Sequence, residues 1–258
     1  MLLEQDVDKL NKKKLRRLNR LILENIYPHE IARNNQNPSV TVDIVIFTIQ
    51  HEKLCVLLIK RKYPPYKGKW AIPGGFVKYK EPLEDAAIRE LEEETGVKEV
   101  YIEQLYTFGE PRRDPRKRVI TVAYFALISS ENLVVRPDTD VSDVRWYSVY
   151  KLPKLAFDHE RIVNYALTRL RNKIMYANVA FQLLSDEFTL TELQKAYEVI
   201  LDKKLDKRNF RKKIISSKIL EETGNKKLEG RHRPARLYRF SAEDCLEDYC
   251  LPKKESGK

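Results

Sequence analysis

Length, composition and charge narrow the class of protein to which this chain belongs. It has 258 residues, 42% of them hydrophobic, which is enough for one or two domains with proper cores. Its formal net charge of +11 at pH 7 predicts an anionic partner. No apolar run reaches the roughly 18 residues that a membrane-spanning helix needs, and the N-terminus lacks a signal-peptide pattern, so we expect no membrane partner. The cysteines, Cys55, Cys245 and Cys250, are too few for a disulfide framework, which favours the reducing cytoplasm.

The first 27 residues have the pattern of a basic amphipathic helix. An approximate apolar stripe of leucines and Ile22 is flanked by Lys and Arg side chains between residues 12 and 20. Such a helix can bind a membrane surface or nucleic acid, but it more often packs on its own domain or pairs in a dimer. Pro28 and the polar run 34–37 end the pattern, so residues 1–37 are predicted to form a basic helix and a linker.

Two strands and a basic loop are predicted next. Residues 40–47 alternate with period two and residues 54–59 are rich in branched apolar side chains, which are strand signals. The loop at residues 60–70 is basic and aromatic. Its Arg61 could pair in a bidentate manner with a pyrophosphate, and its Trp70 could stack on a substrate or fill the core.

Residues 74–97, GGFVKYKEPLEDAAIRELEEETGV, carry the most specific pattern in the chain. Pro82 suits the first turn of a helix, and Gly96 suits the left-handed position that ends one. Three carboxylates stand at positions i, i+3 and i+4 and converge within one turn, those of Glu90, Glu93 and Glu94. Like charges this close repel unless a cation lies between them, and Mg²⁺ prefers carboxylate oxygens. The spacing predicts a metal site, with a solvated acidic face as the plainer alternative.

This stretch resembles the Nudix box, G-x5-E-x7-R-E-U-x-E-E-x-G-U, at every fixed position from Gly75 to Val97. The resemblance implies an α/β fold, an α/β/α sandwich around a mixed sheet, and hydrolysis of a nucleoside diphosphate linked to another moiety. It implies that Mg²⁺ or Mn²⁺ is held by one backbone carbonyl and three carboxylates, those of Gly74, Glu90, Glu93 and Glu94. Arg89 would orient these carboxylates, Glu81 would support them, and the Gly75 backbone would approach the substrate.

Strands are predicted at residues 100–108 and 119–128, with a loop of two prolines and five cations between them. Its composition indicates either a substrate-facing loop or a solvated basic turn. The cations that we expect to contact phosphates are Arg113, Arg116 and Arg118. Nudix enzymes often draw their general base from a loop outside the box. The candidates are Glu110 and three residues before the strand at 144–147, namely Asp138, Asp140 and Asp143. Spacing alone does not choose among them, and we take Glu110 and Asp140 as the candidate bases.

The segment TFGEPRRDPRKRVITVAYFAL, residues 107–127, and the later LPKLAFDHERIV, residues 152–163, resemble one Nudix branch in particular. That branch holds ADP-ribose pyrophosphatase-like proteins and the Nudix-related transcriptional regulators of the NrtR and AraR kind. The resemblance covers roughly residues 38–240. Lys117 stands where relatives usually have Gly, so the tip of that loop is expected to differ.

A second domain is predicted at residues 158–241, after a Nudix domain at residues 38–157. Its expected elements are a connecting helix at 159–176, a helix from Thr189 to about Leu201, a helix at 207–218 capped by Asp206, and paired strands at 219–222 and 235–240. Thr189 and Glu192 have the spacing of a capping box. This order is that of a winged helix-turn-helix domain. Residues 242–258 are predicted to form a flexible tail.

Charge supports a DNA-binding role for that domain. Residues 206–240 hold twelve Lys and Arg against four Asp and Glu, a net charge of +8. The candidate DNA contacts on the third helix and the wing are Lys207, Arg208, Arg211, Lys212, Arg231, Arg233 and Arg236. The alternative is a winged helix used for dimerisation or for contact with another protein. Symmetric DNA sites would require a homodimer, which we expect.

Two functions are compatible with these patterns. The first is a Mg²⁺-dependent pyrophosphohydrolase that cleaves ADP-ribose or a related nucleoside diphosphate sugar and carries a domain for double-stranded DNA. The second is a regulator of the NrtR or AraR type whose pocket binds ADP-ribose or a sugar with little or no hydrolysis. The undamaged box places hydrolysis first, because a pure sensor has no physical need for three converging carboxylates.

Overall fold

The computed structural model of the chain describes residues 37–96, 100–130, 141–228 and 234–241. The chain divides into two units, residues 1–38 and 39–258, and the second is described below. The predicted helix at residues 1–27 and the predicted tail at 242–258 lie outside the described residues. Within the ranges described, no helix is long and apolar enough to cross a membrane.

In these ranges, seven strands form one sheet with a central order β3-β2-β1-β6-β5, while β4 pairs with β1 and β7 pairs with β2. The strands are β1 (Ser39–Gln50), β2 (Lys53–Arg61), β3 (Trp70–Ala71), β4 (Gly74–Phe76), β5 (Tyr101–Phe108), β6 (Val119–Leu127) and β7 (Val141–Ser148). β1 and β6 run parallel, whereas β1 is antiparallel to β2 and β4. The mixed sheet that the Nudix resemblance implied is confirmed.

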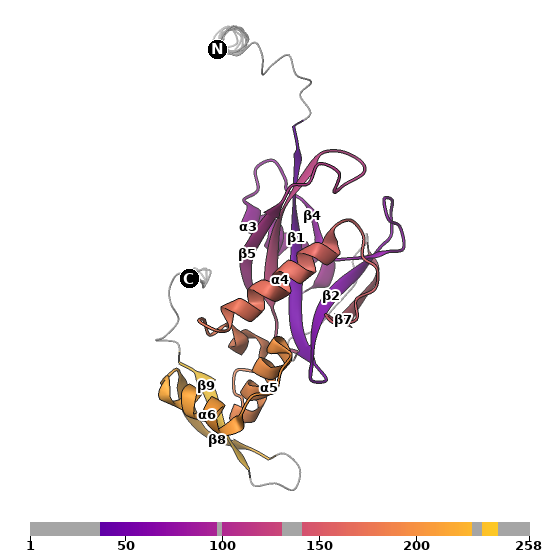
Figure 1. Cartoon of the computed structure of the whole chain (residues 1–258). Coiled ribbons are helices and arrows are strands. Elements are labelled where there is room, and N and C mark those ends of the chain that lie inside the picture. Colours follow the sequence, from indigo (N-terminus) through magenta and orange to yellow (C-terminus); the bar gives the residue numbers. More distant parts are fainter. Residues whose placement is uncertain (1–36, 97–99, 131–140, 229–233, 242–258) are drawn as a thin grey trace, which may run out of the picture. The chain divides into compact units, whose positions relative to one another are not determined.

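The sheet lies between two helices, as Figure 1 shows. Successive side chains of a strand point to opposite faces, and β1 is apolar on both. Ile44 and Ile46 pack with Ala87 and Leu91 of α3 (Leu83–Thr95). Val45 and Phe47, on the other face, belong to a cluster that includes the apolar side of α4 (His159–Lys173). Helix, sheet and helix form the predicted α/β/α sandwich.

The C-terminal part is a winged helix. It consists of a short 3-10 helix, two α-helices and a hairpin, namely η2 (Val179–Leu183), α5 (Leu190–Leu201), α6 (Lys207–Ser216), β8 (Leu220–Lys227) and β9 (Ala235–Phe240). Phe188 and Leu193 are central to its core, and Phe188 exchanges two backbone hydrogen bonds with Tyr238 of the wing. The capping box is confirmed, since the Thr189 hydroxyl accepts from the Glu192 N–H and the Glu192 carboxylate accepts from the Thr189 N–H.

The hydrophobic packing continues across residue 158, where the sequence placed a domain boundary. Ile162 and Leu170 of α4 and Ile200 of α5 belong to the same cluster as the sheet residue Phe47. The reason is that the apolar side of α4 packs against the sheet and also against residues of η2 and α5. The boundary itself stays a prediction.

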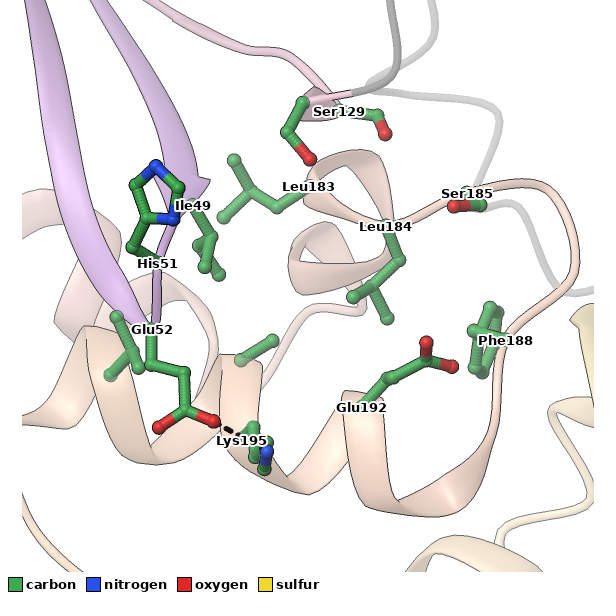
Figure 2. Close-up of a pocket in the computed structure, with 13 residues that line it drawn as sticks. Ile49, His51, Glu52, Ser129, Leu183, Leu184, Ser185, Phe188, Glu192 and Lys195 are labelled. Carbon is green, nitrogen blue, oxygen red and sulfur yellow. Dashed lines mark hydrogen bonds and ion pairs between the residues drawn. The ribbon is translucent and has the colours of Figure 1, made fainter. Parts of the chain in front are cut away.

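The hairpin between β1 and β2 meets α5. Glu52, at its tip, forms an ion pair with Lys195 of α5. Beside this pair, a cavity of about 240 Å³ is lined by the hairpin, by Ser129 and by residues of η2 and α5 (Figure 2). The sheet and the winged helix therefore contact each other through both charged and apolar groups.

Candidate functional site

Helix α3 carries the box and begins and ends as the sequence predicts. Pro82 precedes its first residue in an extended conformation, and Glu84 and Asp85 lie in the first turn, where the helix dipole favours negative charge. At the other end Gly96 has φ 70° and its N–H donates to the Glu92 carbonyl. The left-handed conformation there is one that glycine adopts without strain.

The Arg89 guanidinium forms hydrogen bonds with three carboxylates of the box. Its Nε and Nη2 donate to the two oxygens of Glu81 at 2.6 and 2.9 Å. Its Nη1 donates to Glu90 Oε1 at 2.7 Å and to Glu93 Oε2 at 3.0 Å. A single cationic nitrogen therefore lies between two of the carboxylates that were predicted to converge.

These contacts change the acidity of the carboxylates in opposite directions. Hydrogen bonds from Arg89 lower the pKa of Glu81 to about 2. Burial raises the pKa of Glu90, and Arg89 opposes that effect. Burial disfavours a carboxylate unless a cation compensates for the lost hydration. Glu90 is therefore a group whose ionised form depends on a neighbouring positive charge.

The glycine loop, residues 72–75, lies directly against the helix that carries the box. A Cβ on Gly75 would lie 2.2 Å from Glu90 Oε1, so no larger residue fits without displacing that carboxylate. Gly74 has φ 154°, and a Cβ there would lie 2.3 Å from the Val42 carbonyl oxygen. Glycine is required at both positions because neighbouring atoms lie too close to leave room for a Cβ. The loop backbone consequently reaches the carboxylates of α3.

The donor set fits a hard divalent cation. Glu90 and Glu93 converge on one cationic nitrogen, and the Gly74–Gly75 backbone lies beside Glu90. Mg²⁺ and Mn²⁺ prefer such oxygen ligands. Among the side chains that the structure describes, no three His, Cys, Asp or Glu form a ready metal cluster. The third predicted carboxylate, on Glu94, is a side chain outside that description.

Arg113, predicted to contact substrate, is buried in an ion-pair cluster. Its side chain is 4% exposed and donates to Asp43 Oδ2 at 3.1 Å and to Asp158 Oδ1 at 2.8 Å. His159 lies next to Asp43, with Nε2 3.8 Å from Oδ1. This environment favours a positioning role for Arg113. Asp43, Asp158 and His159 are site-adjacent residues that sequence reasoning missed, although one signal existed, because Asp43 interrupts an apolar strand.

The remaining predicted substrate residues lie at two places around the sheet. Arg116 pairs with Asp114 at 2.7 Å, is 43% exposed on its side chain, and lies over the ring of Phe76 in β4. Arg118 donates to the Gly109 carbonyl at 2.6 Å. The loop at 109–118 is thus brought beside the strand that follows the glycine loop, and Glu110 is exposed within it. Asp140 lies outside the described residues.

Arg61 and Trp70 lie together near the β2–β3 edge. Arg61 Nε donates to the Pro65 carbonyl at 2.9 Å, and its guanidinium lies over the ring of Phe157. Trp70 packs edge-on against Tyr147 at 5.0 Å and contacts the sheet core. Of the two interpretations of Trp70, these contacts agree with core packing.

The candidate DNA surface is the outer side of α6 and the wing. Three of the predicted contacts on α6 are exposed cations, Lys207, Arg208 and Lys212. Arg211 is half-buried, and its Nη2 donates to Thr191 Oγ1 at 3.1 Å, so it also joins α6 to α5. Arg236 on β9 pairs with Glu222 at 3.0 Å. Arg231 and Arg233 lie outside the described residues.

A Nudix sandwich joined to a basic winged helix defines a class of DNA-binding proteins built on a Nudix fold. Residues 37–166 match the NUDIX domain family, and residues 180–240 match the family described as the NrtR DNA-binding winged helix domain. The second match places the chain in a narrower group within that class.

Relatives agree with this placement. The chain is 41% identical over 221 residues to the "ADPR responsive transcriptional repressor NtrR" of Acinetobacter baylyi, covering 84% of this chain and 87% of the relative. It superposes on Shewanella oneidensis NrtR complexed with a 27mer DNA with a TM-score of 0.71 and 41% identity, over 78% of this chain and 93% of that one. An ADP-ribose pyrophosphatase of Methanocaldococcus jannaschii is 39% identical, over 49% of this chain and 72% of the relative. The chain belongs to the NrtR family of Nudix-related transcriptional regulators.

Proposed function

We propose that the chain is a transcriptional regulator that binds ADP-ribose in its Nudix domain and double-stranded DNA with its winged helix. The observation that carries this proposal is the pairing of an undamaged Nudix box with an NrtR winged helix in one chain. A relative that aligns over 87% of its own length is named as ADPR-responsive, which supports ADP-ribose as the ligand. The sequence alone placed hydrolysis before regulation, and the family membership now places regulation first.

The regulatory function requires that ligand and DNA influence one another. ADP-ribose can alter DNA affinity only as far as it binds the DNA-competent and DNA-incompetent states differently. We propose that the chain acts as a homodimer in the cytoplasm, because two symmetric half-sites require two winged helices. The test is a mobility-shift assay with a duplex selected from a random library, with and without ADP-ribose. Loss or gain of the shifted band with ligand supports regulation, and an unchanged band opposes it.

A second function, hydrolysis of ADP-ribose to AMP and ribose 5-phosphate, is supported by the assembled box. We propose that the carboxylates of Glu90, Glu93 and Glu94 and the Gly74 carbonyl hold Mg²⁺ or Mn²⁺. When bound, such a cation would supply charge neutralisation at the pyrophosphate and would polarise a water molecule. Arg89, already bonded to Glu81, Glu90 and Glu93, holds the carboxylates in place.

The chain's other groups would bind and orient the substrate. Arg61, Arg116 and Arg118 are the cations proposed for the phosphates, with Trp70 and the Gly75 backbone beside them. Glu110 or Asp140 would accept a proton from the attacking water. The test is AMP release from ADP-ribose with and without Mg²⁺, in the native protein and in Glu94→Gln. AMP release that needs Mg²⁺ and is lost in the variant supports hydrolysis. Binding of ADP-ribose without AMP release leaves regulation as the one function of the two that is supported.

A further inference from the structure

Four polar side chains, three of them buried and that of Asp158 half-buried, form a cluster between the glycine loop and the start of α4. Asp43 comes from β1, Arg113 from the loop before β6, Asp158 from the N-cap position of α4 and His159 from its first residue. Arg113 bridges the two carboxylates, at 3.1 Å to Asp43 and 2.8 Å to Asp158. Three segments that are far apart in the sequence are therefore joined by one guanidinium.

The histidine of this cluster holds the glycine loop directly. His159 Nδ1 accepts a hydrogen bond from the backbone N–H of Ile72 at 3.1 Å, and both groups are buried. A nitrogen that accepts this bond carries no proton. Burial lowers the pKa of His159, which agrees with a neutral ring. Ile72 stands two residues before Gly74.

The other side of the loop is fixed by β1. Asp43 lies opposite Gly74 in the antiparallel register, and a Cβ on Gly74 would lie 2.8 Å from Asp43 Oδ1. The Pro73 carbonyl accepts from the Ile44 N–H at 2.8 Å. The loop is therefore held before Pro73 by His159 and after it by β1, and Gly75 is in turn pressed against Glu90.

We propose that His159 is a positioning residue: it fixes the Ile72–Gly75 loop against the carboxylates of α3, with its Nε2 beside Asp43, which Arg113 joins to Asp158. The inference rests on the proposed function of the Nudix site, because a fixed loop matters there only if the site binds a cation and a nucleotide. It also gives a role to the Asp158–His159 pair, which lies within residues 152–163 but was not singled out by the sequence. The same pair begins α4, so the loop and the helix are tied at one point.

The experiment compares three substitutions of His159 in the full chain. Asn places an amide oxygen near the position of Nδ1 and can accept the Ile72 bond, whereas Gln extends too far and Leu accepts nothing. The readouts are Mn²⁺ affinity by electron paramagnetic resonance and the exchange rate of the Ile72 amide by NMR. Groups that orient metal ligands typically change affinity by about 10-fold or more when removed. We expect a loss of that size and faster exchange in His159→Leu and His159→Gln, with near-native values in His159→Asn.

The outcomes separate this proposal from the proposed function. His159→Leu that is folded, with native Mn²⁺ affinity and native Ile72 exchange, overturns the positioning role. So does His159→Asn that is as damaged as His159→Gln, a comparison that remains decisive if His159→Leu does not fold. Ile72 exchange is measured without metal or nucleotide. If the native protein binds no Mn²⁺ and the His159→Gln variant still loses protection of the Ile72 amide, the hydrolytic function is contradicted. The contact between His159 and the loop is then still supported.

Discussion

At the scale of single residues, the site depends on how closely the glycine loop approaches Glu90. We predict that Gly75→Ala lowers Mn²⁺ affinity and ADP-ribose turnover by about 10-fold or more, because a Cβ would meet the Glu90 carboxylate at 2.2 Å. Gly109→Ala is the matched control, since the nearest atoms to its Cβ lie at 3.9 Å. Calorimetric titration with Mn²⁺ and an AMP assay measure both effects. Equal behaviour of the two variants would contradict the close approach.

Arg89 gives a prediction about pH. Its hydrogen bonds lower the pKa of Glu81 from 4.5 to about 2, so the ionised carboxylate stabilises the folded state above pH 4.5. That contribution is lost as the pH falls through the folded pKa. We predict that Arg89→Met is less stable than the native protein at pH 7 and that the difference narrows between pH 4.5 and 2. Urea unfolding across this range tests it; a difference that is constant with pH would refute the assignment.

The sequence could predict the residues of the box but not the partners of Arg113. Glu81, Arg89, Glu90 and Glu93 lie on or beside one helix, so local spacing places them together. Arg113 bonds to Asp43 and Asp158, which are 70 and 45 residues away in the chain. No local pattern reports such contacts, and the cations and prolines of this loop indicated a substrate-facing loop or a solvated turn instead.

At the scale of elements, periodicity and capping signals were sufficient for the long strands and helices. They missed β3, β4 and η2, which have two, three and five residues. β3 and β4 exist because they pair with β2 and β1, and such pairing is invisible to a local pattern. β3 ends just before the glycine loop and β4 begins within it, at Gly74, so two of the three elements that the sequence missed position the site.

Helix α6 gives a prediction about DNA. Lys212 is exposed on it, whereas Arg211 also bonds to Thr191 and joins two helices. We predict that Lys212→Ala weakens binding to all duplexes similarly and lowers the slope of affinity against salt by about 1. Arg211→Ala should weaken binding and also reduce thermal stability. Lys154→Ala, an equal charge change on an exposed lysine of the sheet domain, is the control. Fluorescence anisotropy over a salt series measures the slopes, and equal slopes for Lys212→Ala and the control would contradict the assignment.

At the scale of the whole molecule, the β1–β2 hairpin contacts α5, and we predict that this contact takes part in coupling ligand binding to DNA binding. Glu52 and Lys195 pair across it, beside the cavity shown in Figure 2. We predict that Glu52→Lys alone changes the factor by which ADP-ribose alters DNA affinity. The double variant Glu52→Lys with Lys195→Glu should restore it, because the pair is re-formed with reversed charges. Anisotropy titrations with and without ADP-ribose measure the factor. If the single and double variants behave alike, the pair plays no part in coupling.

The central claim is that one chain links a Nudix ligand to DNA, and reciprocal binding tests it most directly. The measurement is DNA affinity at zero and saturating ADP-ribose, then ADP-ribose affinity at zero and saturating DNA, with AMP release followed in parallel. Thermodynamic linkage requires ADP-ribose to change DNA affinity by the same factor by which DNA changes ADP-ribose affinity. In allosteric proteins this factor is typically about 5-fold or more. The account predicts equal factors of at least that size. DNA affinity that does not respond to bound ADP-ribose would contradict it.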